Sequence, residues 1–286
     1  MGKVNGFLRL MRPINCVMMG FAVFVGAVLA NPQFASADWL KVKVIYGFLT
    51  GFLLTAASMA INDYYDRAID AINEPSRPIP SGLVSTKEAL AFVSVLSVVG
   101  FFFAYLASLL CLAVAVISWI IMATYVTVGK RSGLPGNFLV GACMAIPFIY
   151  GSITVMSQVQ LNVVLFASMA FLSGTGREIT KGIVDVNGDK AQDVKTLAVR
   201  YGERNAAAVA AVFYVSAVSL TPVTWLLSLV SFWFIPLVLI TDIGLVASSI
   251  LLLRDYSREN ARKIKNLVLL WFVIGLLAFV FGSVFK

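Results

Sequence analysis

The chain has 286 residues, of which 60% are hydrophobic and 13% are charged, and its formal net charge is +8. Soluble domains carry about 25% charged residues, so this composition predicts an integral membrane protein rather than a soluble one. The sequence contains no histidine, which excludes imidazole bases, haem ligation through histidine and histidine-based zinc sites. It also contains no basic soluble segment of the kind that binds nucleic acid, so we expect no nucleic-acid partner.

Nine apolar stretches follow one another along the chain, each close to the roughly 20 residues that cross a bilayer. The first is not followed by a signal-peptidase cleavage pattern, so we expect a retained span. The uncharged run from Leu90 to Val128 is too long for one helix across about 30 Å, so we divide it near Ala107 and Ser108. The expected spans cover about residues 13–30, 43–62, 88–107, 109–128, 137–156, 161–178, 205–226, 230–252 and 265–284.

The distribution of lysine and arginine orients these spans, because these residues concentrate in cytoplasmic loops. If the N-terminus lies in the cytoplasm, nineteen of the 22 basic residues fall on the cytoplasmic side. Only Lys41, Lys43 and Lys286 fall outside. The sequence therefore predicts one all-α, multi-pass domain in the cell membrane over residues 1–286. Its nine helices would place the N-terminus in the cytoplasm and the C-terminus outside.

The acidic residues gather in two of the predicted cytoplasmic loops, residues 62–88 and 177–204, which hold ten of the 14. In the first loop, a helix continuing past the membrane would present four polar side chains within one quarter of its circumference, at about 100° per residue. These side chains are Asn62, Asp63, Asp66 and Asp70. In the second loop, Glu178, Asp185 and Asp189 would lie within about 40° of one another.

Carboxylates packed this closely repel one another unless a cation lies between them. Mg²⁺ takes oxygen ligands and typically binds through one or two carboxylates together with the phosphates of a substrate. The two clusters therefore predict a diphosphate bound through Mg²⁺, with cationic side chains as further donors to its phosphates. The candidate donors are Arg12, Arg77, Lys130, Arg131, Lys181 and Lys195. For any single acid a solvated loop residue is the simpler interpretation, but two clusters at helical spacing on one predicted face favour a binding site.

Residues 62–70 follow the pattern N-D-x-x-D-x-x-x-D, and residues 76–82 follow S-R-P-x-x-S-G. Together they resemble the first motif of the UbiA family of intramembrane prenyltransferases. The D-x-x-x-D of residues 185–189 resembles the second motif, and the resemblance covers nearly the whole chain. Within the family, residues 12–26 and 177–202 are most similar to the archaeal digeranylgeranylglyceryl phosphate synthases.

The resemblance implies helices arranged around a central cavity and Mg²⁺-dependent transfer of a geranylgeranyl group. The donor would be geranylgeranyl diphosphate and the acceptor geranylgeranylglyceryl phosphate, so the product would carry the second ether bond of archaeal membrane lipids. The expected surroundings are membrane lipid, and no obligate protein partner is implied. Gly182 departs from the pattern, since many relatives carry an acid there. The second metal site is therefore expected to have fewer ligands or to rely more on Glu178.

The resemblance also assigns roles to individual residues. The catalytic residues would be Asn62, Asp66, Asp70, Asp185 and Asp189. The metal ligands would be Asn62, Asp63, Asp66, Asp70, Glu178, Asp185 and Asp189. The phosphate-binding residues would be Arg12, Arg77, Lys130, Arg131 and Lys181. Tyr64, Tyr65 and Tyr125 would either shield an allylic cation with their π faces or form an interfacial aromatic belt.

Two other functions fit part of the sequence. An aromatic prenyltransferase of quinone biosynthesis would share the motifs, but the basic residues in 130–131 and 177–204 favour a phosphorylated acceptor. A non-enzymatic ion or phosphate transporter would more often place its acids near the middle of the membrane, whereas these gather at one predicted face. Asp242 is the one acid inside a predicted span, and is either functional or hydrogen-bonded to a neighbouring helix.

Overall fold

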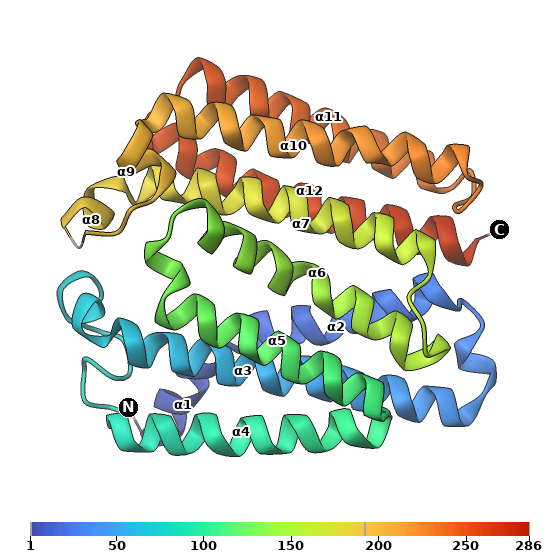
Figure 1. The fold of residues 1–286 in the computed structure, drawn as a ribbon, viewed down its shortest axis with the longest axis horizontal. Helices are drawn as coiled ribbons and strands as arrows, with labels where there is room; N and C mark the ends of the chain where they lie inside the picture. The colour runs from blue at the N-terminus through green and yellow to red at the C-terminus, as the bar shows by residue number, and fades with distance from the viewer. Residues whose placement is uncertain (1, 192, 286) are drawn as a thin grey trace.

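The regular secondary structure is helical in the computed structural model, which describes residues 2–191 and 193–285. The long helices lie side by side and run roughly along one axis (Figure 1). In chain order the helices are α1 (Lys3–Met11), α2 (Pro13–Ala30), α3 (Asp38–Asn73), α4 (Thr86–Ala107), α5 (Leu109–Thr127), α6 (Leu134–Met156), α7 (Leu161–Val184), α8 (Val186–Ala191), α9 (Leu197–Tyr201), α10 (Glu203–Leu226), α11 (Phe234–Arg254) and α12 (Arg258–Val284). Two 3-10 helices, η1 (Phe34–Ser36) and η2 (Gly129–Arg131), lie in the connections.

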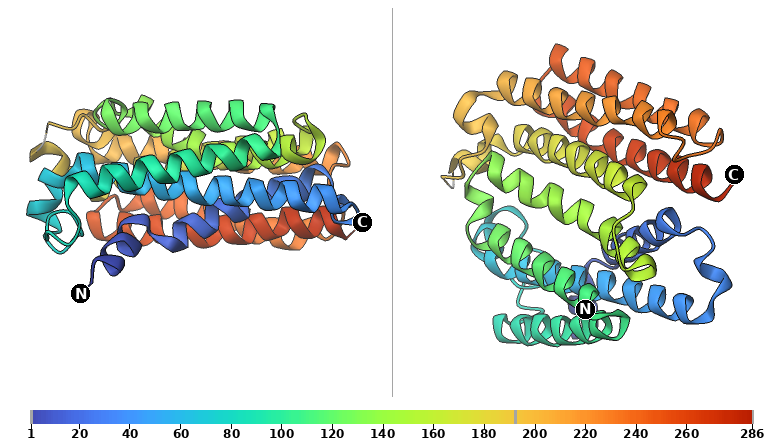
Figure 2. Two further views of the ribbon diagram at one scale, coloured as in Figure 1. Left: turned by 90° about the horizontal axis from the view of Figure 1, so that it is seen from below. Right: turned by 45° about the vertical axis from the view of Figure 1, so that its right-hand side comes forward.

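Each predicted span overlaps a long helix, and within the described residues eight helices are long and apolar enough to cross a membrane. α7, which covers the sixth predicted span, has 24 residues but is not one of the eight. Its polar residues Ser173, Thr175 and Thr180 are buried, because α7 packs between other helices rather than facing outward. The chain ends lie at opposite ends of the bundle (Figure 2). The count of nine spans and the side on which each terminus lies stay predictions.

The predicted division between the third and fourth spans is confirmed at the residue level. α4 ends at Ala107 and α5 begins at Leu109, with Ser108 between them in an extended conformation. The Ser108 hydroxyl accepts a hydrogen bond from the backbone N–H of Cys111 and so caps α5. At the other end of α4, Ser85 and Glu88 form a capping box that satisfies two backbone N–H groups.

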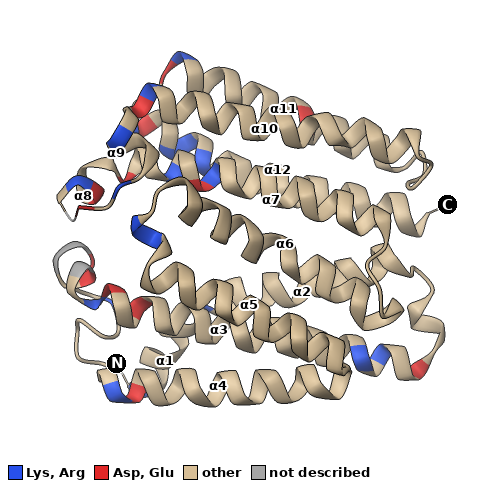
Figure 3. Ribbon diagram, in the orientation of Figure 1, with Lys and Arg blue, Asp and Glu red and all other residues tan. Residues whose placement is uncertain are grey.

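Two helices extend beyond the predicted spans, as the helical spacing of the acidic residues indicated. α3 continues to Asn73 and carries the whole first acidic motif, and α7 continues to Val184, so that the second motif begins directly after it. The short helices α1, α8 and α9 were not predicted. α1 is too short to cross a membrane, and it is held by packing of the fully buried Leu10 against α3 and α4. These additions all lie at the end of the bundle where the charged residues gather (Figure 3).

Helices α2 and α6 cross so closely that glycine is required at the contact. A Cβ added at Gly26 would lie 2.1 Å from the carbonyl oxygen of Phe148, and one added at Gly151 would lie 2.1 Å from that of Val23. Beside this crossing, Val25, Phe148 and Phe166 belong to an apolar core to which the C-terminal helices also contribute. The crossing thus joins the N-terminal and C-terminal helices of the bundle.

Candidate active site

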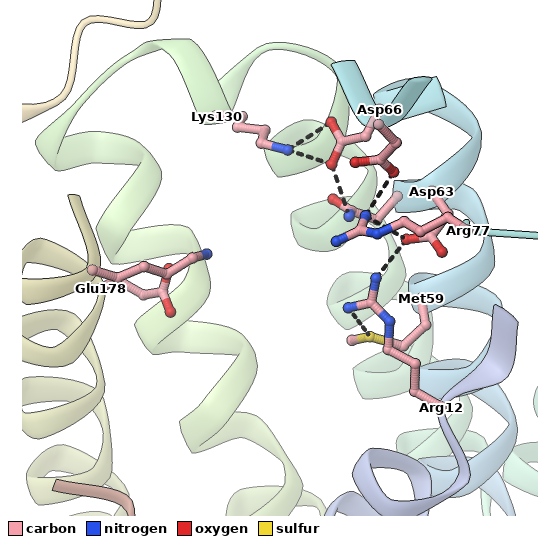
Figure 4. Close-up of polar contacts among 10 residues, drawn as sticks. Arg12, Met59, Asp63, Asp66, Arg77, Lys130 and Glu178 are labelled. Carbon is pink, nitrogen blue, oxygen red and sulfur yellow. Dashed lines mark hydrogen bonds and ion pairs between the residues drawn. The ribbon is translucent and has the colours of Figure 1, made fainter. Parts of the chain in front are cut away.

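Three aspartates on the last turns of α3 are buried, and each contacts a cationic side chain from a different segment (Figure 4). Asp63, Asp66 and Asp70 are 3%, 8% and 5% exposed. They lie on one side of α3, as the helical spacing predicts, whereas Tyr65 on the same turns is 47% exposed. The predicted cluster of polar side chains is therefore present, and it faces the protein interior.

Arginines hold the first and last of these carboxylates. Arg12 Nη2 donates to Asp63 Oδ1 at 2.6 Å, and Arg77 Nη1 donates to Asp70 Oδ2 at 2.6 Å. Arg77 Nη1 also lies 3.5 Å from Asp63 Oδ1, so the two arginines share that aspartate. Burial raises the pKa of Asp70, and the charge of Arg77 beside it opposes the rise.

Lys130 holds the middle carboxylate. Its Nζ donates to Asp66 Oδ1 at 2.6 Å and also to Oδ2, while Asn62 Nδ2 donates to Oδ2 at 3.0 Å. Lys130 lies in η2, and its positive charge also acts on Asp70 and on Asp189 of α8. This lysine is therefore positioned between the two acidic clusters.

The backbone at Arg12 positions its guanidinium. Arg12 separates α1 from α2 and has φ of 52°, a left-handed conformation that ends the first helix, and Pro13 then begins the second. The turn directs the side chain toward α3, where Nη1 also lies 3.7 Å from Met59 Sδ. Arg77 reaches the same helix from the segment after α3. The first cluster is thus assembled from four separate parts of the chain.

The second cluster is more open than the first. Glu178 on α7 accepts hydrogen bonds from Arg177 Nη1 at 3.3 Å and from Lys181 Nζ at 3.2 Å. The prediction that one continuous helix carries Glu178, Asp185 and Asp189 is wrong. α7 ends at Val184, Asp185 leaves the helical conformation at φ −97° and ψ 4°, and Asp189 belongs to α8. Burial and the charge of Asp185 raise the pKa of Asp189 to about 6.

A cavity of about 450 Å³ lies between α2, α3, α5, α6 and α7. Most of its lining is apolar, with Leu54, Trp119 and Met144 among the larger side chains. One end carries Arg177 and Glu178, and the lining also includes Met59, Tyr125 and Cys143. In Figure 4, Glu178 lies on α7 across from the ion pairs of α3. The cavity therefore combines a long apolar space with a charged end.

The predicted tyrosines differ in their surroundings. Tyr125 lines the cavity, but Tyr64 packs under the guanidinium of Arg67, 4.6 Å from its ring centre, and Tyr65 is exposed. Of the three, only Tyr125 is placed to face a substrate in the cavity. Arg131 and Lys195 are exposed, and within the described residues neither forms an ion pair with a predicted metal ligand.

The oxygen donors suit a hard divalent cation. No group of three or more acidic, cysteine or histidine side chains converges on one point within the described residues. Mg²⁺ does not need such a cage, because one or two carboxylates and the phosphates of a substrate complete its shell. The buried carboxylates of Asp66 and Asp70 each form an ion pair with a cationic side chain. Their negative charge is therefore available to balance a cation at this site. The residues of the first cluster therefore fit Mg²⁺ as ligands.

The family model for the UbiA prenyltransferase family matches residues 19–282, which is most of the chain. The chain belongs to the UbiA prenyltransferase family. This UbiA protein is 39% identical to digeranylgeranylglyceryl phosphate synthase of Archaeoglobus fulgidus, over 96% of the chain and 94% of the relative. It is 34% identical to the synthase of the same name in Methanosarcina mazei, over 98% of each. The family and the apolar helices make it a multi-pass membrane prenyltransferase.

Solved structures show the same fold. A structure of digeranylgeranylglyceryl phosphate synthase superposes with a TM-score of 0.83 at 31% identity, covering 99% of each chain. A UbiA homolog from Archaeoglobus fulgidus, described as bound to GPP and Mg²⁺, superposes with a TM-score of 0.69 at 17% identity, covering 96% of this chain and 99% of that one. The second likeness, at this low identity, concerns the fold alone.

Two residues without an assigned role in the sequence, Arg177 and Asp242, are placed by the structure of this UbiA protein. Arg177 was counted among the basic residues of 177–204 but was given no individual role, and its side chain lines the cavity beside Glu178. A role for Arg177 could have been predicted, because it directly precedes the predicted metal ligand Glu178 at the end of an apolar helix. Asp242, whose role was left open, accepts a hydrogen bond from Thr221 Oγ1 at 2.7 Å, so it links α11 to α10 away from the cavity. This contact agrees with the helix-linking alternative.

Proposed function

We propose that this protein transfers a geranylgeranyl group from geranylgeranyl diphosphate to geranylgeranylglyceryl phosphate, with Mg²⁺, and so forms the second ether bond of archaeal membrane lipids. The observation that carries the proposal is the apolar cavity with a charged end, within a chain similar over its length to two archaeal synthases of that name. An amphiphilic diphosphate suits such a cavity, because its tail occupies the apolar space and its phosphates lie among the cations.

The cationic residues would bind the diphosphate and stabilise the charge that develops on it as it leaves. Arg12, Arg77, Lys130 and Lys181 are placed to do so, since each already holds a carboxylate at the charged end of the bundle. Preorganised cations in a water-poor site stabilise a developing anion far more than water does. The apolar lining would keep water from the allylic carbon while the acceptor hydroxyl approaches.

Mg²⁺ would supply Lewis-acid stabilisation of the leaving diphosphate. The residues proposed to hold it in the first cluster are Asn62, Asp66 and Asp70, with Asp63 beside them. Those in the second cluster are Asp185 and Asp189, with Glu178 beside them. The UbiA homolog from Archaeoglobus fulgidus is described as bound to GPP and Mg²⁺, which supports the use of a divalent metal with a prenyl diphosphate. Without histidine, the proton of the acceptor hydroxyl would pass to a carboxylate or to the departing diphosphate.

The charged end of the bundle is proposed to face the cytoplasm, and the nine-span arrangement is part of the same proposal. Figure 3 shows that charged residues gather at the end where α8 and α9 lie, with a smaller group at the start of α3. A cytoplasmic excess of lysine and arginine is the usual signature of membrane orientation. Both proposed substrates would therefore be bound at the cytoplasmic face.

The proposed function is tested with purified protein, Mg²⁺ and labelled geranylgeranyl diphosphate. We expect label to enter geranylgeranylglyceryl phosphate but not 4-hydroxybenzoate, and we expect a chelator to stop transfer until Mg²⁺ is restored. Transfer only to 4-hydroxybenzoate would replace the proposal with an aromatic prenyltransferase. Absence of transfer to both acceptors, with protein that is folded in detergent, would favour the transporter.

The cavity predicts a limit on the length of the donor. Ser118 lines the cavity from α5, and Ser118→Trp would fill part of its apolar space. We expect the ratio of kcat/KM for geranylgeranyl diphosphate to that for geranyl diphosphate to fall by about 10-fold or more, since one methylene in an apolar pocket is worth roughly 10–200-fold. Ser118→Ala is the matched control and should leave the ratio within about twofold. An unchanged ratio in Ser118→Trp would show that the tail lies elsewhere.

Gly182 offers a test of the second metal site. It lies on α7 between Glu178 and Asp185, and an added Cβ would meet Thr196 Cβ at 3.6 Å, an ordinary contact. We expect Gly182→Asp to fold and to lower the Mg²⁺ concentration needed for half-maximal activity several-fold, because another carboxylate increases the charge at the site. Gly182→Ala is the control for the backbone change. Equal Mg²⁺ requirements in the two variants would mean that position 182 does not contribute to metal binding.

A further inference from the structure

The two charged clusters differ in how their cations are used. In the first, Arg12, Arg77 and Lys130 pair with three buried aspartates, so each cation has a carboxylate partner. In the second, two cations share Glu178, and further basic groups lie beside them on α12. Because a diphosphate and a phosphate monoester repel each other, an enzyme that binds both needs two separate cationic sites.

Arg177 has donor capacity that the protein does not use. Its side chain is 19% exposed, and it lines the charged end of the cavity. Nη1 contacts Glu178, but Nε is buried and has no hydrogen-bond partner within the described residues. A buried donor without a partner is costly, so the guanidinium of Arg177 keeps hydrogen-bonding capacity that a small movement of its side chain would offer to a ligand.

Lys265 is the neighbouring cation on α12. It is half-buried, and the charges of Asp185, Arg177, Lys181 and Arg262 act on it. No carboxylate lies within ion-pair distance of Lys265 among the described residues. Packing holds this part of α12 in place, because Ile264 and Val268 are buried in the apolar core that α7 and α12 share.

Helix α12 reaches the cavity through one apolar residue near Lys265. Leu269 lines the cavity, and it lies one turn along α12 from Lys265 on the same face. A cation followed by an apolar wall matches an amphiphile with a phosphate at one end. The proposed function assigns Arg12, Arg77, Lys130 and Lys181 to the donor diphosphate, so Arg177 and Lys265 are the neighbouring cations that remain for the acceptor.

We propose that Arg177 and Lys265 bind the phosphate monoester of the acceptor and are the residues that make the enzyme require a phosphorylated acceptor. Arg177 would contact the phosphate through its guanidinium, and Lys265 would contribute a point charge from the opposite helix. The inference rests on the proposed function for the identity of the acceptor. It adds Arg177 on α7 and Lys265 on α12 to the phosphate-binding groups, beside the residues proposed for the donor diphosphate and its Mg²⁺.

The test is steady-state kinetics of Lys265→Gln and Arg177→Gln. Hydrogen bonds to charged groups are among the stronger ones, so we expect the KM for geranylgeranylglyceryl phosphate to rise by about 10-fold or more. The KM for geranylgeranyl diphosphate should stay within about twofold, since its partners are unchanged. The wild type should prefer this acceptor over unphosphorylated geranylgeranylglycerol, and the variants should lose that preference. Lys265→Arg keeps the positive charge and should retain the preference for the phosphorylated acceptor. Lys263→Gln, at an exposed position on the same helix, is the matched control.

A rise in the donor KM, or an unchanged acceptor KM in both variants, would overturn the inference. Binding of geranylgeranylglyceryl phosphate to donor-free protein, measured by calorimetry in detergent, separates this failure from failure of the proposed function. If the wild type binds the lipid phosphate and Lys265→Gln does not, the site stands even where transfer to that acceptor is absent. Equal affinity in wild type and variant would exclude the site whatever reaction the enzyme catalyses. Thermal melting of each variant verifies that it is folded.

Discussion

Asp66→Asn is expected to lower kcat by on the order of 1,000-fold, the upper range for loss of one electrostatic contact to a developing charge. Asp66 is buried, accepts hydrogen bonds from Lys130 and Asn62, and is proposed to hold Mg²⁺ at the first cluster. The amide has the same shape but lacks the negative charge, so it binds the metal weakly and leaves Lys130 without a counter-charge. Turnover with labelled donor and acceptor at saturating Mg²⁺ measures the loss.

The variant should remain folded, because asparagine keeps a hydrogen-bond acceptor where the carboxylate was. Asp255→Asn is the control, since Asp255 is an exposed acid at the end of α11, and its turnover should stay within about twofold of the wild type. Near-normal activity of Asp66→Asn in folded protein would remove Asp66 from the set of metal ligands. The ion pair between Asp66 and Lys130 would then have a structural role only.

Gly151→Ala is expected to destabilise the protein by about 3 kcal/mol or more, the upper end of the usual cost of overpacking. The added methyl group would lie 2.1 Å from the carbonyl oxygen of Val23 and 2.6 Å from the backbone nitrogen of Ala27. Both atoms belong to the backbone of α2, so no side chain can rotate away, and α2 and α6 must separate. The melting temperature in detergent reports this loss.

The same change should also reduce activity. Val23 and Tyr150, which flank the crossing, line the cavity, so separating α2 from α6 would alter the space for the substrate. Gly188→Ala is the stability control, because no atom lies within 4 Å of the position that its Cβ would occupy. A melting temperature of Gly151→Ala equal to that of the wild type would contradict the close crossing of the two helices.

Several features followed from local chemistry and could be predicted without the fold. The length of each apolar run indicated the long helices, and the uncharged run that needed two helices divides at Ser108 as expected. Helical spacing put Asp63, Asp66 and Asp70 on one side of α3, because the period of an α-helix does not depend on its surroundings. The same reasoning failed for Asp189, since α7 ends at Val184 and the helix period no longer applies beyond it.

The partners of those acids depended on tertiary packing. No spacing rule connects Arg12 with Asp63 or Lys130 with Asp66, because these residues are 51 and 64 positions apart in the chain. The cavity and the approach of Lys265 to Arg177 likewise require α12 to return beside α7. Composition and periodicity thus determined the membrane class, the helices and the acidic clusters, all of which depend on residues near one another in sequence. Only the packing of distant helices decided which cation meets which carboxylate and which residues face a substrate.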